Sequence, residues 1–301
     1  MSSQRVLLVG LLLAVIHAET SDGLCAQDAA QDKGIYLIVR GDDIGSCHAA
    51  NVACIQSYTE GIMTTVELMV PCPWFPEAVK LLNENPGLDV GIHVVLTSEW
   101  QNYKWRPLTS APSLTDEDGY FYPMIWQRRD MPPRTALRDA SWKIEEIEKE
   151  MRAQIELAVR KVPHISHLTC HMGCSGWHPK VKEVWTRLSR QYNLHLVPSE
   201  YGVRGTGGFG DAKTAKERIE RFAEILEGLK PGTYLFVEHP GLDTPEMCAI
   251  GHRGYYGVAE DRDAVTKVFT SREVKKAIKK LGIRLISYAD LKKTSPASKT
   301  H

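Results

Sequence analysis

The sequence lacks an excess of charge of either sign. Among its 301 residues, Lys plus Arg and Asp plus Glu number 37 each, so the formal net charge is zero. Proteins that bind nucleic acid or anionic lipid usually present a basic surface, and this composition provides no general basic field. We therefore expect no nucleic-acid partner, and the balanced charge favours a small or neutral substrate.

A hydrophobic run long enough to cross a bilayer is also missing. The apolar run at residues 6–16 is shorter than the ~20 residues that a transmembrane helix needs. It follows Arg5 and precedes the small residues Ala18 and Ala26, which is the order found in an export signal. We predict a signal peptide over residues 1–26, cleaved after Ala18 or Ala26, no stable membrane insertion, and a secreted or periplasmic mature chain. The alternative is a buried N-terminal strand or helix.

Two motifs that would indicate other chemistry are incomplete. The glycine-rich run at residues 202–210 lacks the Gly-Lys-Ser/Thr ending of a phosphate loop, so we expect a mobile loop there. Cys170 and Cys174 lack a second Cys/His pair at zinc-finger distance. Seven cysteines, six of them after residue 26, permit disulfides in an oxidising compartment without showing them. Buried thiols, or one disulfide, are the expected state of this pair.

Short runs rich in β-branched residues alternate with segments of helical period, which is typical of βα units around a parallel sheet. The expected strands are 36–40, 65–70, 90–96, 164–170, 194–198, 234–238 and 284–287. The expected helices are 49–58, 76–83, 141–162, 213–229 and 272–281. This pattern predicts an α/β fold, a deviant (β/α) barrel of about seven parallel strands with helices outside.

The regular pattern lapses over residues 97–138, a stretch rich in Trp, Tyr, Pro and Asp. A long irregular connection in a compact domain is usually functional or poorly ordered, and its aromatic content favours an ordered flap. No linker or internal repeat divides the chain, so residues 27–301 are expected to form a single domain. No pattern in the sequence specifies an oligomeric state.

Acidic and imidazole side chains fall at the expected carboxyl ends of several strands. Asp42 and Asp43 end the first strand between two glycines, where barrel enzymes hold their active sites. Adjacent side chains on an extended segment point different ways, so the pair suits two roles better than one. The alternative is a turn with a helix cap. His93 lies in the apolar strand 90–96, where a histidine is commonly a hydrogen-bonded core residue.

Two further strands end at histidines. His171 follows strand 164–170 and is a better ligand candidate than His167, which suits an indirect role behind a ligand. His239 closes strand 234–238, where Pro240 and Gly241 end the strand. One Asp with two neutral His is a ligand set that leaves positions open for water and substrate. A metal in such a site would acidify its water and polarise a carbonyl, while the remaining Asp and His239 exchange protons.

In their order along the chain, these motifs resemble those of the YdjC/ChbG-type carbohydrate deacetylases, relatives of the polysaccharide deacetylases. The matching segments are Gly41-Asp42-Asp43-Ile44-Gly45, Thr64-Thr65 with Leu68-Met69-Val70, Gly91-Ile92-His93-Val94-Val95-Leu96-Thr97, Arg106-Pro107-Leu108, Pro112-Ser113-Leu114 with Asp118-Gly119, Ser166 through Gly173, and His239-Pro240-Gly241.

The resemblance implies a metal-dependent hydrolase of a C–N amide bond that removes the acetyl group of an N-acetylated saccharide. It implies one divalent metal ion, with Mg²⁺ favoured by precedent and Zn²⁺ or another transition ion possible. The implied ligands are Asp43, His93 and His171, the implied general base is Asp42, and the implied general acid is His239. Residues implied behind the ligands or in the loop over the sugar are His167, Arg106, Ser113 and Leu114.

The sequence departs from the family pattern at two positions. Thr169 stands where many members have an acidic or amide residue, and Glu67 stands where small polar residues are frequent. Both lie beside the expected site, so the departures concern the support of the ligands and the choice of substrate more than metal binding itself.

Two other functions fit parts of the pattern. A glycoside hydrolase needs two carboxylates that face each other across the sugar, roughly 5–10 Å apart. Adjacent Asp42 and Asp43 are poorly arranged for that, although Glu67 or Glu238 could supply the second carboxylate. A sugar-binding barrel without turnover is the other alternative, but simple binding does not need an acid and a base around a metal.

Overall fold

The computed structural model describes residues 34–294. The predicted signal peptide lies outside the described residues, so it remains a prediction. Within the described range, no helix is both long enough and apolar enough to cross a membrane.

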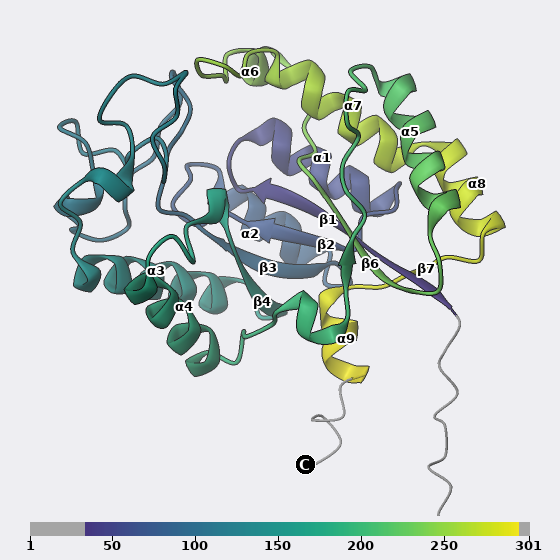
Figure 1. The fold of residues 1–301 in the computed structure, drawn as a ribbon, viewed down its shortest axis with the longest axis horizontal. Coiled ribbons are helices and arrows are strands. Elements are labelled where there is room, and N and C mark those ends of the chain that lie inside the picture. The colour runs from purple at the N-terminus through teal and green to yellow at the C-terminus, as the bar shows by residue number, and fades with distance from the viewer. Residues whose placement is uncertain (1–33, 295–301) are drawn as a thin grey trace, which may run out of the picture. The chain divides into compact units, whose positions relative to one another are not determined.

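A parallel sheet of seven strands forms the centre of the fold (Figure 1). Its order is β4-β3-β2-β1-β6-β5, and β7 pairs with the beginning of β1. The sheet curls into a half-barrel, which confirms the predicted fold class. The strands are β1 (Ile35–Ile44), β2 (Thr65–Leu68), β3 (Asp89–Val94), β4 (Ile165–Cys170), β5 (Arg204–Gly205), β6 (Gly232–Glu238) and β7 (Arg284–Leu285).

Six of the seven expected strands are present, but the expected strand at 194–198 is wrong. That segment lies beside the edge strand β4 and accepts one backbone hydrogen bond, from Leu168 N to Leu194 O at 3.1 Å. It then turns away into a 3₁₀ turn, Pro198–Tyr201. The fifth strand in sequence order is instead β5, which lies within the glycine-rich run that we expected to be a loop. An apolar, β-branched run therefore forms a strand only where a neighbour offers a full ladder of hydrogen bonds.

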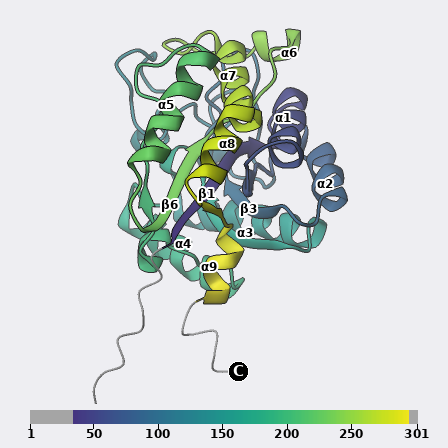
Figure 2. The same cartoon turned by 90° about the vertical axis from the view of Figure 1, so that its right-hand side faces the viewer.

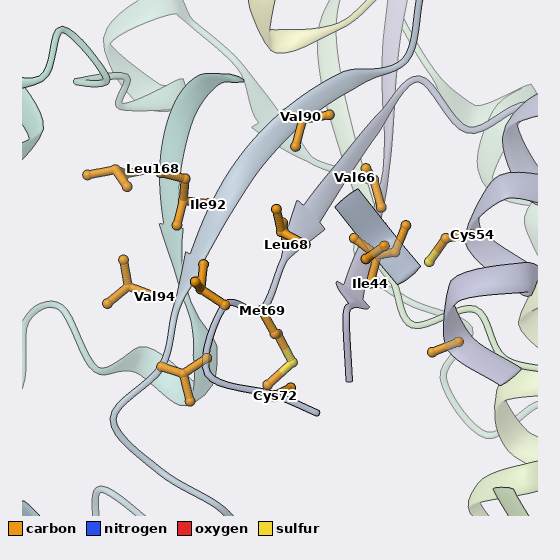
Figure 3. Packing of buried hydrophobic residues seen from close by; sticks show 14 of the residues in the cluster. Ile44, Cys54, Val66, Leu68, Met69, Cys72, Val90, Ile92, Val94 and Leu168 are labelled. Carbon is orange, nitrogen blue, oxygen red and sulfur yellow. The ribbon is translucent and has the colours of Figure 1, made fainter. Parts of the chain in front are cut away.

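Alternating side chains give the sheet two different faces. Leu37, Val39, Val66 and Leu68 belong to the large apolar core, and Figure 3 shows Leu68 of β2 beside the labelled apolar side chains of β3 and β4. Ile38, one residue out of phase, belongs to a second, smaller cluster with Tyr288. Because successive strand residues point to opposite faces, the inner face carries the alternate positions, and most of these are polar. The inner residues of the first four strands include Arg40, Asp42, Thr65, Glu67, Gly91, His93, His167 and Thr169.

Helices cover the outer face and contribute to the large core (Figures 1 and 2). The helices α5, α7 and α8 pack on one another, and α1 packs on α7. The helices are α1 (His48–Thr59), α2 (Phe75–Glu84), α3 (Ile144–Lys161), α4 (Pro179–Gln191), α5 (Ala215–Gly228), α6 (Pro245–Cys248), α7 (Val258–Thr270), α8 (Arg272–Lys280) and α9 (Tyr288–Thr294). All five expected helices are present, whereas α4, α6, α7 and α9 were not expected.

The irregular stretch between β3 and α3 is held by its own buried aromatics. Trp100 and Trp105 are buried, and Trp105 Nε1 donates to Thr97 O at 2.8 Å. The stretch contains the 3₁₀ turns Pro112–Leu114 and Leu137–Asp139 and two isolated bridges, Thr115 with Phe121 and Met124 with Ala136. In Figure 1 it lies on the side toward which the arrowheads of β1 and β2 point, so it flanks the carboxyl edge of the sheet.

Candidate metal centre

The centre begins with an irregularity in β1. The register of β1 against β2 shifts between Gly41 and Ile44, and Asp43 has a positive φ of 76°. A non-glycine residue with positive φ is strained, and such strain persists only where the surroundings hold it. The bulge lets two adjacent side chains reach one site. His93 Nε2 is 3.8 Å from Asp42 Oδ2 and 3.7 Å from Asp43 Oδ1. Our expectation that an extended chain would send the two carboxylates different ways is therefore wrong.

Asp43, His93 and His171 come together at the carboxyl edge of the sheet. One nitrogen or oxygen atom from each lies within 4.8 Å of the others, and all three residues are buried. His171 Nδ1 is 3.5 Å from Asp43 Oδ1. His171 begins a 3₁₀ turn, His171–Gly173, in which Met172 has a positive φ of 51°. The strand therefore ends sharply at His171, which turns the imidazole back toward Asp43.

The far nitrogen of each imidazole has a hydrogen-bonding partner. His171 Nε2 lies 3.1 Å from Glu99 Oε2, and His93 Nδ1 lies 2.9 Å from Thr169 Oγ1. Metal-binding histidines almost always use their second nitrogen in this way, which fixes the ring and its tautomer. The nitrogens that face Asp43 are therefore Nε2 of His93 and Nδ1 of His171.

Two arginines hold the two aspartates. Arg262 Nη2 donates to Asp43 Oδ2 at 2.7 Å, and both side chains are buried. Arg40 binds Asp42 through two parallel hydrogen bonds, from Nε to Oδ1 at 2.7 Å and from Nη2 to Oδ2 at 2.8 Å. Such a fork fixes the plane of a carboxylate as well as its position. Each aspartate is thus oriented before any ligand enters.

The same contacts decide the charge states of the three candidate ligands. Burial disfavours a charged Asp43, but the Arg262 guanidinium together with His171 and His239 outweighs it and holds the pKa of Asp43 well below its usual range. Burial lowers the pKa of His93 to about 4, so this ring is neutral at physiological pH. Burial also opposes the charge of His171, but Glu99 and Asp43 raise the pKa of His171 to about 10. Without a cation, His171 therefore keeps a proton between two carboxylates.

One atom at the centre has no partner. Asp43 Oδ1 is buried and accepts no hydrogen bond from any residue in the range 34–294. An ionised carboxylate oxygen without a donor is costly in a protein interior. A divalent cation between Asp43 Oδ1, His93 Nε2 and His171 Nδ1 would satisfy this atom and replace the proton on His171. The donor set therefore fits a resident metal ion.

His239 lies just after β6, which pairs with β1 from Ile35 to Gly41. The side chain is half-buried and makes no hydrogen bond within the described part of the chain. Burial lowers the pKa of His239, while the charges of Asp43 and Asp42 oppose that shift and Arg262 reinforces it. The lowered pKa favours the neutral imidazole, so His239 must take up a proton before it can act as the expected general acid.

The remaining predicted residues lie farther from the three ligands. His167 is buried and binds Glu67, with Nε2 at 2.8 Å from Oε1. Arg106 is exposed and stacks over the ring of Tyr120 at 4.5 Å. Ser113 Oγ accepts from Lys143 N at 2.9 Å, and Leu114 is fully buried. The last three thus anchor the irregular stretch, and their expected contact with sugar stays a prediction.

Glu99, Arg262 and Arg40 were not predicted as site residues. Glu99 lies in the irregular stretch, where no periodicity places a side chain. Arg262 lies on the unexpected helix α7 and reaches Asp43 across 219 positions of sequence. Arg40 could have been predicted from the sequence, because a residue two positions before Asp42 in a strand lies on the same face as Asp42. His252 is buried and stacks on Trp100 with ring centroids 5.5 Å apart.

The cysteines of the described range are all free thiols, namely Cys47, Cys54, Cys72, Cys170, Cys174 and Cys248. Four of them are buried. Cys174 Sγ donates to Val94 O at 3.3 Å and Cys170 Sγ to Ser175 Oγ at 3.0 Å. The pair therefore acts as small core and turn residues in this structure, one of the two states expected for it.

A cleft of about 330 Å³ lies near the centre, although none of the three candidate ligands lines it. Glu99, which binds His171, belongs to its lining, so the cleft reaches the back of a candidate ligand. The exposed ring of Tyr256 lines it as well, together with Lys104 and Arg253. Its size is within the range of small-molecule sites, and its mixed lining offers an aromatic face and several hydrogen-bond donors.

Comparison with known proteins identifies relatives along most of the chain. A family model described as YdjC-like protein matches residues 36–280. A carbohydrate deacetylase of Thermus thermophilus is 34% identical over 240 residues, covering 71% of this chain and 80% of the relative. A carbohydrate deacetylase of Brevibacillus brevis is 29% identical over 275 residues, covering 85% and 99%.

A solved structure from Enterococcus faecalis V583 has the same fold. It superposes with a TM-score of 0.65 at 22% identity, covering 86% of this chain and 99% of the other. At that identity the likeness concerns the fold alone. Because the family model spans more than half of the sequence, this chain belongs to the YdjC-like protein family.

Proposed function

We propose that this protein is a metal-dependent carbohydrate deacetylase, which hydrolyses the N-acetyl group of an acetylated amino sugar or oligosaccharide. The observation that carries the proposal is the convergence of Asp43, His93 and His171 around the unpartnered Asp43 Oδ1. The names of the relatives from Thermus thermophilus and Brevibacillus brevis support the substrate class.

The three ligands would hold one divalent ion. When bound, it supplies a Lewis acid that polarises the acetamide carbonyl and acidifies a nearby water. Two imidazole nitrogens with one carboxylate suit Zn²⁺ and other transition ions, whereas Mg²⁺ prefers oxygen ligands. The family resemblance favours Mg²⁺, so both ions belong in the experiment.

The side chains of the centre divide the proton transfers between them. Asp42, held in one plane by Arg40, accepts the proton of the attacking water. His239, once it has taken up a proton from solvent, gives that proton to the leaving sugar nitrogen, so that the C–N bond breaks to release acetate and a free amine. Asp42 then holds one proton more and His239 one fewer, and exchange with solvent restores both.

A glycoside hydrolase is poorly supported by the positions of the other carboxylates. Glu67 is fully buried and bound to His167 and Thr169, so it is not free to attack a sugar. Glu238 has the same strand phase as Phe236, whose ring packs on Phe222 of α5, and its Oε1 lies 3.5 Å from a Cβ placed on Gly208. Glu238 therefore points to the helical side of the sheet and away from Asp43.

We also propose that the mature protein acts outside the cytoplasm, because residues 1–26 have the order of an export signal. N-terminal sequencing of protein secreted by the producing cell should start at Glu19 or Gln27. Recovery of the full-length chain from the cytoplasm alone would contradict this proposal.

Metal affinity should increase with pH. His171 keeps a proton up to a pKa of about 10 in the metal-free protein, and a cation must displace that proton. Below this pKa we expect apparent affinity to fall by up to about tenfold for each unit of decrease in pH. Calorimetric titration with Zn²⁺ and Mg²⁺ between pH 6 and pH 9 measures the slope, and exposed His48, changed to Ala, serves as control. Affinity independent of pH would contradict the assignment of His171.

Substitution of His239 should separate proton transfer from metal binding. We expect His239→Ala to lower kcat for acetate release from N-acetylglucosamine oligosaccharides by about 10²- to 10⁴-fold, the usual contribution of a general acid. Its metal affinity should be unchanged, whereas His171→Ala should lose both. Acetate release that survives chelation would rule out the metal-dependent mechanism, and new reducing ends without acetate would indicate a glycoside hydrolase.

Tyr256 should contribute to saccharide binding but not to chemistry. It is 69% exposed, although it lines the cleft beside Glu99, and an exposed aromatic face there can stack on a sugar ring. We expect Tyr256→Ala to raise KM for oligosaccharides about two- to tenfold, with kcat nearly unchanged. Trp74, exposed and outside this cleft, provides the matched control as Trp74→Ala. If both variants behave alike, the cleft is not the saccharide site.

A further inference from the structure

A chain of hydrogen bonds runs beneath His93 on the inner face of the sheet. His93 Nδ1 lies 2.9 Å from Thr169 Oγ1, and the Thr169 hydroxyl donates to Glu67 Oε2. The other oxygen of Glu67 lies 2.8 Å from His167 Nε2. The sheet register brings these residues together, because it pairs His93 with Thr169 and places both Glu67 and His167 beside Gly91.

The directions of these hydrogen bonds are determined by the chemistry of the groups. An ionised carboxylate can only accept, and a hydroxyl has a single proton to donate. Because Thr169 gives its proton to Glu67, its oxygen must accept from His93, which requires a proton on Nδ1. A neutral imidazole protonated on Nδ1 has its lone pair on Nε2, the atom 3.7 Å from Asp43 Oδ1.

The chain is anchored at its other end as well. Ser166 Oγ donates to Asp89 Oδ1 at 2.6 Å, so its lone pair faces His167 Nδ1 at 2.7 Å. Both nitrogens of His167 then donate, one to Ser166 and one to Glu67. Asp89 in turn accepts from the backbone N of Ala289 at 3.0 Å. No member of this chain can reverse its hydrogen bond without leaving a buried carboxylate facing a lone pair.

Burying the Glu67–His167 pair costs free energy, which argues against a role in packing alone. Glu67 is 0% exposed and His167 1%. Burying charged groups costs free energy even when they are paired, and an apolar pair of similar volume is often as stable. Room for the pair also depends on Gly91, where an added Cβ would lie 2.2 Å from Glu67 Oε2 and 2.4 Å from His167 Nε2. Burial raises the pKa of Glu67. The charges of His167 and Arg40 outweigh this effect, lower the pKa to about 2 and keep the carboxylate ionised.

We propose that Thr169, oriented by Glu67, is a positioning residue that fixes His93 in the tautomer with its proton on Nδ1. The Nε2 lone pair is thereby presented to the cation. Glu99 plays the same role for His171, because it binds Nε2 of that ring directly and leaves Nδ1 to face the cation. This inference rests on the proposed metal-dependent function, because it assigns Nε2 of His93 as a ligand atom.

The experiment compares Thr169→Val, which removes the hydroxyl at nearly constant volume, with Thr169→Ser, which retains it. Thr65→Val is the matched control, because Thr65 is buried on the neighbouring strand β2 and its hydroxyl has no partner among the described residues. Cobalt(II) binding and the absorption spectrum of the bound ion are recorded for each variant. Thermal unfolding of the metal-free proteins reports separately on stability.

We expect Thr169→Val to bind cobalt about 10- to 100-fold more weakly, as is usual when the partner of a metal-binding histidine is lost. Thr169→Ser should recover most of the affinity, and Thr65→Val should match the wild type. The tautomer is read independently of any variant, from the ring ¹⁵N resonances of His93 in the metal-free wild-type protein, which should show the proton on Nδ1.

A proton on Nε2 in the wild-type protein would overturn the proposal, and so would a Thr169→Val variant with wild-type affinity and spectrum. These results would leave the metal-dependent function intact, provided that the wild-type protein binds metal and releases acetate. If the wild-type protein binds no divalent ion, both the function and this role of Thr169 are wrong.

Discussion

The candidate metal centre depends on the backbone of Asp43. A regular strand would send adjacent side chains to opposite faces, yet the centre needs both Asp42 and Asp43 on the inner side. The positive φ of Asp43 and the register shift in β1 resolve this conflict. Such strain costs of order 1–3 kcal/mol and persists only where other contacts maintain it. Here Arg262 provides such a contact, because it holds Asp43 in a buried ion pair.

The alternation of strand faces explains how a sheet with apolar strands can hold a charged interior. Outer-face residues such as Val39 and Leu68 pack under the helices, while their neighbours Arg40 and Glu67 lie inside. The inner charges are paired, with Arg40 bound to Asp42 and Glu67 to His167. The helices therefore stabilise the fold from one face, and the inner face is left for the chemistry.

The sequence predicts those features of the fold and the site that depend on patterns within a few neighbouring residues. Local patterns located β1, β3, β4 and β6, and with them the residues at their carboxyl ends, because periodicity and β-branching act over a few residues. The segment 194–198 has the same pattern but meets the edge strand β4 at only one backbone hydrogen bond, which no local signal reveals.

Contacts between distant segments were equally invisible to local reasoning. Arg262 comes from α7, a helix that was not predicted, and it reaches Asp43 across 219 positions of sequence. Glu99 comes from a stretch without any period, and only tertiary structure places it against His171. The burial of His252 likewise depends on a distant segment, since Trp100 of the irregular stretch stacks on its ring. The proposed ligands and proton carriers were thus easier to predict than the residues that hold them.

The two departures from the family pattern are best understood together. Glu67 and Thr169 are 102 positions apart in sequence, yet their side chains are joined by a hydrogen bond. Thr169 alone could either donate to His93 or accept from it, and without Thr169 the Oε2 atom of Glu67 would lose its donor, although Oε1 would still bind His167. Together they fix the direction of both hydrogen bonds: the Thr169 hydroxyl on β4 donates to Glu67 on β2 and accepts from His93. An acid placed at position 169 could accept from His93 directly and would not need Glu67. A change at either position is therefore coupled to the other, and comparing each separately with the family overstates how far this centre departs from its relatives.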